Sequence, residues 1–388
     1  MIDLTLGVAS LVVWLYLLLG RGRFWRSIVL FEADRPNNQR RREGKWPRVA
    51  AIVPARDEAG VIGSAVAALA AQDYPGPFAI VVVDDQSSDG TADVARGAAA
   101  GRVSVITGDS PPAGWAGKVW AMAQGVATAD SAPEAPEYFM FVDADIALEP
   151  SVLRGLVGLA REKGAILASL MVKLRCESPA ERWLVPAFVF FFQMLYPFSW
   201  VEDPRSRIAA AAGGCMLVHR RSLAEAGGLA ALRGALIDDC TLAALMKRQG
   251  RIWVGLTHDA LSLRAYPGFS DIGRMVARSA FAELRFSALR LIAVVAAMGL
   301  VFLAPPLLVV FSRGAQQALG AAAWAIMAFV FAPTLRLYGR PVLTGLALPG
   351  IAAAYMLFTV QSALEYWTGR GGLWKGRIKA PAPNAERA

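Results

Sequence analysis

Three long apolar runs near the C-terminal end constrain the possible fold of this chain most strongly. They cover about Leu291–Phe311, Ala318–Leu335 and Val342–Leu364, and each is close to the ~20 residues that a membrane-spanning helix needs. A fourth run, Leu4–Leu19, lies near the N-terminal end. Of the 388 residues, 55% are hydrophobic, which excludes a disordered protein. We therefore predict one N-terminal and about three C-terminal transmembrane helices.

The charges around the N-terminal run predict its orientation. Arg21 and Arg23 follow the run, whereas Asp3 precedes it. This order is the reverse of a secretory signal, so we predict a retained anchor over 1–22 and a basic juxtamembrane linker over 23–48. The positive-inside rule places the linker in the cytoplasm, at what we expect to be a bacterial inner membrane crossed several times.

The number of spans conflicts with the charge of the C-terminal tail. Three spans within 289–368 would place the basic tail, 369–388, outside, although its arginines and lysines favour the cytoplasm. Pro305-Pro306 is expected to break the first run, which makes that run the candidate for a re-entrant segment. The aromatic segment Trp183–Trp200 fits either a buried core helix or a helix in the membrane interface. Both questions stay open on the sequence alone.

Between the membrane segments, residues 49–288 have the pattern of a catalytic α/β domain. An apolar strand, Val49–Val53, is followed by a polar loop, an alanine-rich helix over Val61–Ala71, and a second strand over Phe78–Val83. This β-α-β order predicts a parallel sheet. Because ligands of such sheets bind beyond the carboxyl ends of the strands, we expect the functional site there.

Acidic residues stand at those strand ends. Asp84-Asp85 terminate the second strand, and Asp143-Ala-Asp145 follows a third strand, Tyr138–Val142. Carboxylates two residues apart can hold Mg²⁺ or Mn²⁺ against a diphosphate. Acidic residues also serve as turn and capping residues, so each motif alone is weak and the combination is stronger.

Another acidic pair, Asp238-Asp239, begins a predicted helix that ends at Gly250. Two roles are open for Asp239. It can cap the helix, which the helix dipole favours, or it can act as a general base that deprotonates an acceptor hydroxyl.

In order and spacing, these motifs resemble the family-2 glycosyltransferases with the GT-A fold, near the ceramide-glucosyltransferase-like membrane branch. The matching segments are Val53–Glu58, Val83–Thr91, Gly117-Lys118, Asp143–Asp145, Gly213–Ser222 and Asp238-Asp239. Two further segments, Arg278–Phe286 and Gly369–Arg377, resemble the bacterial hopanoid-biosynthesis-associated glycosyltransferases. The resemblance implies a GT-A domain that uses a nucleotide sugar, with UDP as the carrier.

The resemblance also implies a role for each matching residue. Those implied to bind the nucleotide sugar are Pro54, Asp57, Glu58, Asp84, Asp85, Lys118 and Asp143. The implied metal ligands are Asp145 and Asp143, which would hold Mg²⁺ or Mn²⁺. The implied catalytic base is Asp239, next to Asp238, and the acceptor side is Gly213 and Gly214.

One family motif is incomplete. The (Gln/Arg)-x-x-Arg-Trp motif, which contacts the diphosphate, has Ala282–Phe286 as its best counterpart. Arg285 keeps the guanidinium that can bind phosphate, and Arg278 is a possible substitute. Both arginines are equally consistent with juxtamembrane charges.

The predicted activity is inverting, metal-assisted transfer of a sugar to a membrane lipid, which the narrower resemblance implies is a hopanoid. One alternative is a processive polysaccharide synthase, which would need more spans and an intact Arg-Trp motif. A second is a catalytically weak membrane scaffold for lipid-biosynthesis enzymes. The net charge of +9 does not indicate a nucleic-acid partner, because the basic residues gather beside the membrane segments.

Overall fold

The structure is a computed structural model that describes residues 2–32, 45–371, 373–374 and 377–378. Residues 33–44 of the predicted linker and most of the predicted tail lie outside these ranges. The chain forms two compact units. Unit 1 comprises Met1–Ile28, Cys176–Ser199 and Ala265–Gly371, and unit 2 comprises Val29–Arg175, Trp200–Arg264 and Gly372–Ala388.

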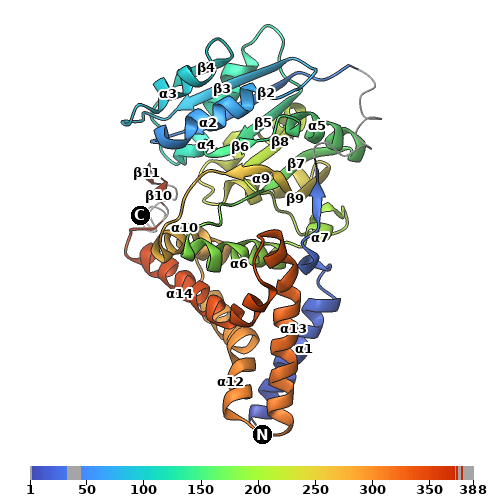
Figure 1. Cartoon of the computed structure of the whole chain (residues 1–388). Helices are drawn as coiled ribbons and strands as arrows, with labels where there is room; N and C mark the ends of the chain where they lie inside the picture. Colours follow the sequence, from blue (N-terminus) through green and yellow to red (C-terminus); the bar gives the residue numbers. More distant parts are fainter. Residues whose placement is uncertain (1, 33–44, 372, 375–376, 379–388) are drawn as a thin grey trace. The chain divides into compact units, whose positions relative to one another are not determined.

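Unit 2 is built on a mixed sheet (Figure 1). In the described part of the chain its order is β1-β9-β7-β8-β5-β2-β3-β4, with β6 paired to β9. The strands are β1 (Val29–Phe31), β2 (Val49–Ala55), β3 (Phe78–Asp84), β4 (Val103–Thr107), β5 (Tyr138–Val142), β6 (Ile146–Leu148), β7 (Ala165–Lys173), β8 (Cys215–His219) and β9 (Arg251–Ser262). The neighbours β5, β2, β3 and β4 are parallel, whereas β8 is antiparallel to β5 and β7. The predicted parallel β-α-β arrangement is confirmed.

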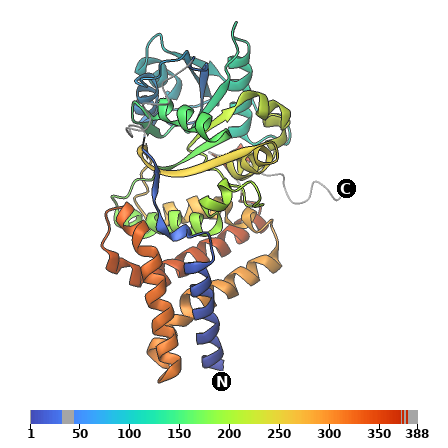
Figure 2. The same ribbon diagram turned by 90° about the vertical axis from the view of Figure 1, so that its right-hand side faces the viewer.

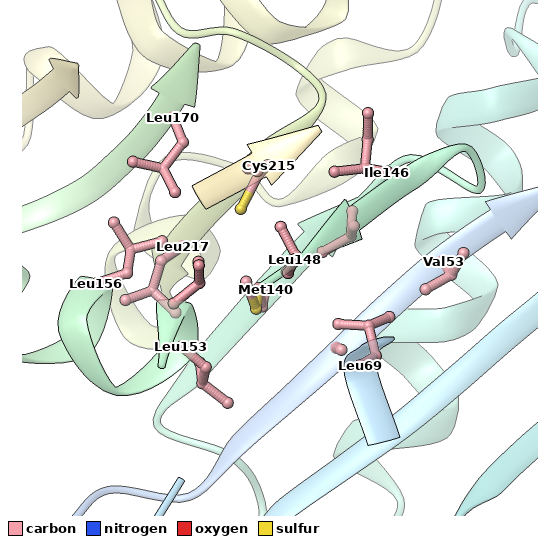
Figure 3. Packing of buried hydrophobic residues seen from close by; sticks show 14 of the residues in the cluster. Val53, Leu69, Met140, Ile146, Leu148, Leu153, Leu156, Leu170, Cys215 and Leu217 are labelled. Carbon is pink, nitrogen blue, oxygen red and sulfur yellow. The ribbon is translucent and has the colours of Figure 1, made fainter. Parts of the chain in front are cut away.

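Helices cover both faces of this sheet. They are α2 (Ala59–Ala70), α3 (Thr91–Ala98), α4 (Gly117–Asp130), α5 (Val152–Lys163), α8 (Arg220–Glu225), η3 (Leu229–Leu232) and α9 (Asp238–Lys247). Alternate residues of β3 face different helices, since Val82 belongs to the core that contains α2 and α5, whereas Val83 packs with Ala121 of α4. Figure 3 shows Leu153 of α5 near Met140 in that core. Burial on two faces explains why these strands are continuously apolar.

Close packing fixes α4 against the sheet. A Cβ atom added to Gly125 would lie 2.5 Å from Cγ2 of Ile52 on β2, a distance that no side chain tolerates. Only glycine therefore lets the helix approach so closely. This approach positions the N-terminal turn of α4, which carries Lys118.

Unit 1 is helical. Its elements are α1 (Ile2–Leu19), η1 (Phe24–Arg26), α6 (Pro179–Leu195), α10 (Phe269–Glu283), α11 (Ala288–Met298), the π-helical turn η4 (Gly299–Leu303), α12 (Ala304–Phe311), α13 (Ala315–Leu337), η5 (Val342–Ala347) and α14 (Leu348–Trp367). The short helix α7 (Phe198–Glu202) spans the boundary between the units. Figures 1 and 2 both show α1 beside α13.

Three helical segments in the described part of the chain are long and apolar enough to cross a membrane. They cover Ala288–Phe311, Ala315–Leu337 and Val342–Trp367. The helix α1 is apolar but shorter. The three C-terminal segments agree with the three runs expected from the sequence.

The expected break at Pro305-Pro306 is wrong. The first segment continues as one helix through the π-helical turn η4, and the two prolines lie in the first turn of α12. Proline fits a first helical turn because its missing N–H would have little to bond there. A carbonyl of the π-helical turn gains another donor, since Nε1 of Trp14 donates to the Val301 oxygen at 2.7 Å.

The aromatic segment Trp183–Trp200 forms α6 and α7, with Pro197 between them. Phe190 of α6 is fully buried and lies 5.1 Å, between ring centroids, from Phe331 of α13. Trp183 on the same helix is 44% exposed. The helix therefore has one face packed within unit 1 and another face that is open.

Candidate active site

The site in unit 2 lies where three parallel strands end. Asp57 and Glu58 follow β2, Asp85 follows β3, and Asp143 and Asp145 follow β5. Since β2 pairs in parallel with both other strands, their carboxyl ends share one edge of the sheet. The structure thus brings together the acidic residues at the strand ends that the sequence singled out.

The loops after β2 and β3 hold each other in place. Asp57 Oδ1 accepts a hydrogen bond from the Ser88 amide at 2.9 Å, and the Asp57 amide donates to Ser87 Oγ at 2.9 Å. Asp57 and Gln86 have positive φ angles of 49° and 57°, a conformation that costs energy in residues other than glycine. The reciprocal hydrogen bonds compensate for this strain and fix both loops.

Arg56 adds a cation to these loops. Its Nη1 lies 3.7 Å from Asp85 Oδ2 and donates to the Asp85 carbonyl oxygen. Arg56 was not predicted from the sequence, because only its neighbours in the motif carry implied functions. Arg56 neutralises part of the charge that Asp85 brings into the interior.

Asp84 and Asp85 are 6% and 1% exposed. The Oδ1 atom of Asp84 is buried, and no hydrogen bond reaches it from the part of the chain that the structure describes. A buried carboxylate oxygen without a donor is costly. This position is therefore suited to accept a hydrogen bond from a ligand.

Pro54 lies inside β2, paired with Val83. Its N–H is missing, which normally excludes proline from a central strand. The ladder between β2 and β5 ends at Ile52, so Pro54 lies beyond it. Its ring is buried at the start of the loop that carries Asp57.

Lys118 is the centre of a buried ion-pair group. Its Nζ lies 2.6 Å from Asp143 Oδ1 and 3.6 Å from Asp238 Oδ2. Burial alone would lower the pKa of Lys118, but Asp143 and Asp238 outweigh burial and hold this pKa above the ordinary lysine value. Lys118 therefore keeps its positive charge at the site.

A second cation, Arg264, contacts the other strand-end carboxylate. Its Nε lies 2.9 Å from Asp145 Oδ2 and its Nη2 lies 2.5 Å from Glu58 Oε1. Arg264 follows β9, a strand that the sequence analysis did not predict. The sequence signal that could have identified Arg264 is its position two residues after Ser262, where the buried end of β9 lies. Ser262 itself donates a hydrogen bond to Asp145.

Asp239 is oriented by backbone amides. Its Oδ2 accepts a hydrogen bond from the Gly213 amide at 2.9 Å, and its Oδ1 accepts one from the Cys240 amide at 2.7 Å. A Cβ atom on Gly213 would lie 3.0 Å from Asp239 Oδ2. The carbonyl of Gly214 accepts a hydrogen bond from the Asp143 amide at 3.1 Å. The Gly213-Gly214 segment therefore links the end of β5 to the start of α9.

Together these residues form what we call the charge cluster. Its members are Glu58, Lys118, Asp143, Asp145, Asp238, Asp239 and Arg264. Five carboxylates stand against two cations, so the cluster has an excess of negative charge. It therefore favours a further cation.

The donor set fits Mg²⁺ or Mn²⁺ shared with a phosphate ligand. No group of three or more His, Cys, Asp or Glu side chains that could hold a metal is found among the described residues. Mg²⁺, however, commonly uses one or two carboxylates and takes its other ligands from water and phosphate. Asp143 and Asp145 carry hard oxygen atoms of the kind that such a site would use.

Cys215 has no support as a nucleophile in this site. Cys215 on β8 is a free, buried thiol, and burial, followed by the nearby Asp143 charge, raises its pKa to about 12. A thiol with that pKa stays protonated near neutral pH.

Two predicted residues belong to unit 1. Arg278 lies on α10, and Arg285 follows the end of that helix with a positive φ of 51°. Both side chains are exposed within the described chain. Their predicted contact with a diphosphate stays a prediction.

Several solved structures are similar to this chain. A mannosyltransferase from Pyrobaculum calidifontis, solved with GDP-Man and Mn²⁺, has a TM-score of 0.53 at 17% identity, covering 97% of this chain and 100% of its own. Glucosyl-3-phosphoglycerate synthase from Mycobacterium tuberculosis, solved with Mg²⁺ and UDP, has a TM-score of 0.43 at 17% identity, covering 66% and 83%. TarS from S. aureus, solved with UDP-GlcNAc, has a TM-score of 0.38 at 14% identity, covering 87% and 98%. A search of curated proteins gave no match.

The mixed sheet and the first of these likenesses confirm the expected GT-A fold. The family described as "Glycosyltransferase like family 2" matches residues 47–263, more than half of the chain. This match covers every member of the charge cluster except Arg264. The chain is therefore a glycosyltransferase and belongs to the glycosyltransferase-like family 2.

Proposed function

We propose that this enzyme is held in a membrane and transfers a sugar from a nucleotide sugar to a lipid. The charge cluster at the carboxyl edge of the sheet carries the proposal, because it supplies the parts that such a transfer needs. The three long apolar helices support a membrane location. An amphiphilic acceptor could then present its hydroxyl group without leaving the bilayer.

We assign the donor side of the reaction to the loops after β2 and β3. Pro54, Asp57, Asp84 and Asp85 would bind the nucleoside, with the buried carboxylate of Asp85 accepting from the base. Similar proteins have been solved with GDP-Man, UDP and UDP-GlcNAc. The sequence resemblance favours a UDP-sugar for this chain.

The diphosphate would lie at the end of β5. Asp145 and Asp143 would hold Mg²⁺ or Mn²⁺, and an ion bound there would neutralise negative charge on the leaving diphosphate. Lys118 would supply a fixed positive charge beside Asp143. Structures solved with Mn²⁺ or Mg²⁺ among the similar proteins support this choice of ion.

The acceptor side is assigned to Asp239. The amides of Gly213 and Cys240 orient its carboxylate, so it could accept the proton of an attacking hydroxyl. A single base and direct attack would invert the configuration at the sugar carbon.

The narrower proposal is a hopanoid acceptor in a bacterial inner membrane, with unit 2 in the cytoplasm. It is supported by the resemblance of Arg278–Phe286 and by the basic residues that flank the apolar runs. Deleting the gene in its own host should remove a glycosylated hopanoid and accumulate its unglycosylated precursor. An unchanged hopanoid profile would contradict this acceptor but not the general proposal.

The general proposal is tested with membranes that contain the enzyme. They are incubated with labelled UDP-sugars and with GDP-mannose, and the label is followed into extracted lipids with EDTA or with added Mn²⁺. We expect one donor to label a lipid, with loss of labelling in EDTA and recovery with Mn²⁺. No lipid labelling from any of these donors would refute the proposal.

A further inference from the structure

Both carboxylates of the Asp143-Ala-Asp145 motif are already paired with cations of the chain. Asp143 is paired with Lys118 at 2.6 Å, and Asp145 is paired with Arg264 at 2.9 Å. The Arg264 guanidinium also reaches Glu58. The side chains of Asp145 and Glu58 are only 11% and 10% exposed, so water screens this ion pair weakly.

A divalent cation at Asp145 would compete with Arg264. The guanidinium occupies Oδ2 of Asp145, one of the two oxygens that a metal could use. Two positive charges at one carboxylate repel each other strongly in a buried site. A diphosphate that arrives with the metal changes this balance, because its oxygens offer the guanidinium a new bidentate partner.

We propose that Arg264 is an exchangeable counter-ion of Asp145. Without a donor it neutralises Asp145 and Glu58, and with a donor it turns to the diphosphate while the metal takes its place on Asp145. Binding of the metal thereby depends on binding of the nucleotide. This inference rests on the proposed function, since it assumes that the site takes a metal and a nucleotide diphosphate.

The test measures Mn²⁺ binding rather than sugar transfer. The full-length protein is purified in nanodiscs and titrated with Mn²⁺, with and without UDP, while electron paramagnetic resonance reports free Mn²⁺. We expect the wild type to bind Mn²⁺ about tenfold more tightly when UDP is present. In the absence of UDP, Arg264→Gln should bind Mn²⁺ about tenfold more tightly than the wild type does. Adding UDP should then raise the Mn²⁺ affinity of this variant only slightly.

Arg220→Gln is the matched control. Arg220 pairs with Asp130 at 2.6 Å on an exposed part of unit 2, so its loss should leave Mn²⁺ binding unchanged. If Arg264→Gln does not fold, Arg264→Lys keeps the charge but cannot span both carboxylates, and should show a reduced effect of UDP on Mn²⁺ binding.

The two possible failures are distinct. If the wild type binds neither Mn²⁺ nor UDP, the proposed function is wrong. If it binds both but the Arg264 variants couple UDP to Mn²⁺ as the wild type does, only the role of Arg264 is refuted. Equal Mn²⁺ affinity of the wild type with and without UDP would also refute that role.

A separate set of contacts within unit 1 concerns the third apolar segment. The α11–α12 segment and α13 form an antiparallel pair, since a Cβ atom on Gly320 would lie 2.8 Å from the carbonyl oxygen of Pro305. The start of α11 and the end of α13 therefore lie at the same end of unit 1. We call this the basic end, because Arg290 and Arg336 are found there.

After α13 the chain turns back along the same helix. A Cβ atom on Gly345 would lie 2.9 Å from the Ala328 carbonyl oxygen, and Nε1 of Trp324 donates to the Leu346 oxygen at 3.0 Å. At the rise per residue of an α-helix, Ala328 lies roughly 14 Å and Trp324 roughly 20 Å along the helix axis from the end of α13 at Leu337. The η5 turn thus reaches back well along α13.

The helix α14 then returns to the basic end. Its Ala363 packs with Leu291, at the start of α11, and with Phe281. Oγ of its Ser362 accepts a hydrogen bond from the Phe281 amide at 3.0 Å and donates to the Ala277 oxygen. Both ends of the segment 338–367 therefore lie at the basic end of unit 1.

From this path we infer that Val342–Trp367 is a re-entrant segment and does not cross the membrane. The crossing segments are then α1, Ala288–Phe311 and α13. The helix α1 runs in the same direction as α13, because Gly7 abuts Leu319 and Ser27 Oγ lies 2.8 Å from Thr334 Oγ1. Three crossings place the C-terminal tail on the same side as the basic linker, which agrees with the positive-inside rule.

Cysteine labelling in intact bacterial cells tests this topology. Arg313→Cys lies in the turn between α12 and α13, and Thr368→Cys follows α14. A membrane-impermeant maleimide should label Arg313→Cys in intact cells and Thr368→Cys only after the cells are opened, above the background from the native cysteines. Labelling of Thr368→Cys in intact cells would refute the re-entrant path. The result does not depend on whether the enzyme transfers sugar.

Discussion

Single residues in the charge cluster are held by the backbone as well as by opposite charges. Asp239 takes two amide hydrogen bonds, and Asp143 donates its own amide to Gly214. Fixing a side chain in this way reduces the reorganisation that a reaction would require. Substitutions that release Asp239 from these amides should therefore slow the reaction.

Replacing Asp239 tests its assigned role as the base. Asp239→Asn keeps the shape and one oxygen acceptor but cannot take a proton, so we expect the rate of sugar transfer to fall by roughly 10²–10⁴-fold. Labelled lipid per unit of enzyme measures this rate. Asp93→Asn, on the exposed surface of α3, is the control and should leave the rate unchanged. Transfer at the wild-type rate by Asp239→Asn would refute the assignment.

A smaller change next to this residue should have a related effect. Gly213→Ala places a Cβ atom 3.0 Å from Asp239 Oδ2, so the carboxylate must move and transfer should slow by on the order of tenfold or more. Gly97→Ala, in α3 with no atom within 4 Å of its added Cβ, should retain activity and gain up to about 1 kcal/mol of stability. Equal rates for the two variants would show that Asp239 tolerates the displacement.

Whole elements differ in how far the sequence predicts them. The strands β2, β3 and β5 and the helix α9 are recognisable because local apolar runs end in polar or acidic residues. The strands β7, β8 and β9 were not predicted, because their apolar runs do not end in an acidic motif. Arg264 was missed because its carboxylate partners precede it by more than one hundred residues.

A proline pair led to a wrong prediction for one helical element. Pro305-Pro306 suggests a break, but a π-helical turn before the pair lets the helix continue. The donor that bonds to this turn, Trp14, is 287 residues from its acceptor. No local pattern contains that information.

The close contact between α4 and the sheet can be tested by a substitution. Gly125→Ala forces a Cβ atom toward Ile52 at 2.5 Å, so we expect a loss of about 1–3 kcal/mol in stability. The change in Tm of the purified enzyme measures it. Gly60→Ala on α2, where an added Cβ meets no atom within 4 Å, should not lower Tm. A Gly125 variant as stable as the Gly60 variant would mean that α4 can shift freely.

The whole molecule combines a catalytic α/β unit with apolar helices. If these helices are integral to a membrane, alkaline carbonate washing should leave nearly all of the chain in the membrane pellet, because the washing removes only peripheral proteins. Immunoblots of the pellet and supernatant measure the distribution. Release of most of the chain into the supernatant would contradict insertion, and with it the lipid-side part of the proposed function.

The division of the chain into discontinuous units limits how the enzyme can be shortened. The family match spans residues 47–263, yet α6 in the middle of that range belongs to unit 1. In unit 1, Phe190 packs on Phe331, Phe191 packs on Tyr355, and the Tyr355 hydroxyl donates to the Leu184 carbonyl. A fragment cut at the borders of the family match would therefore expose an aromatic helix without its partners, which favours aggregation. A soluble catalytic fragment would therefore need a redesigned α6, in which the face that packs on α13 and α14 is made polar, as well as removal of both ends of the chain.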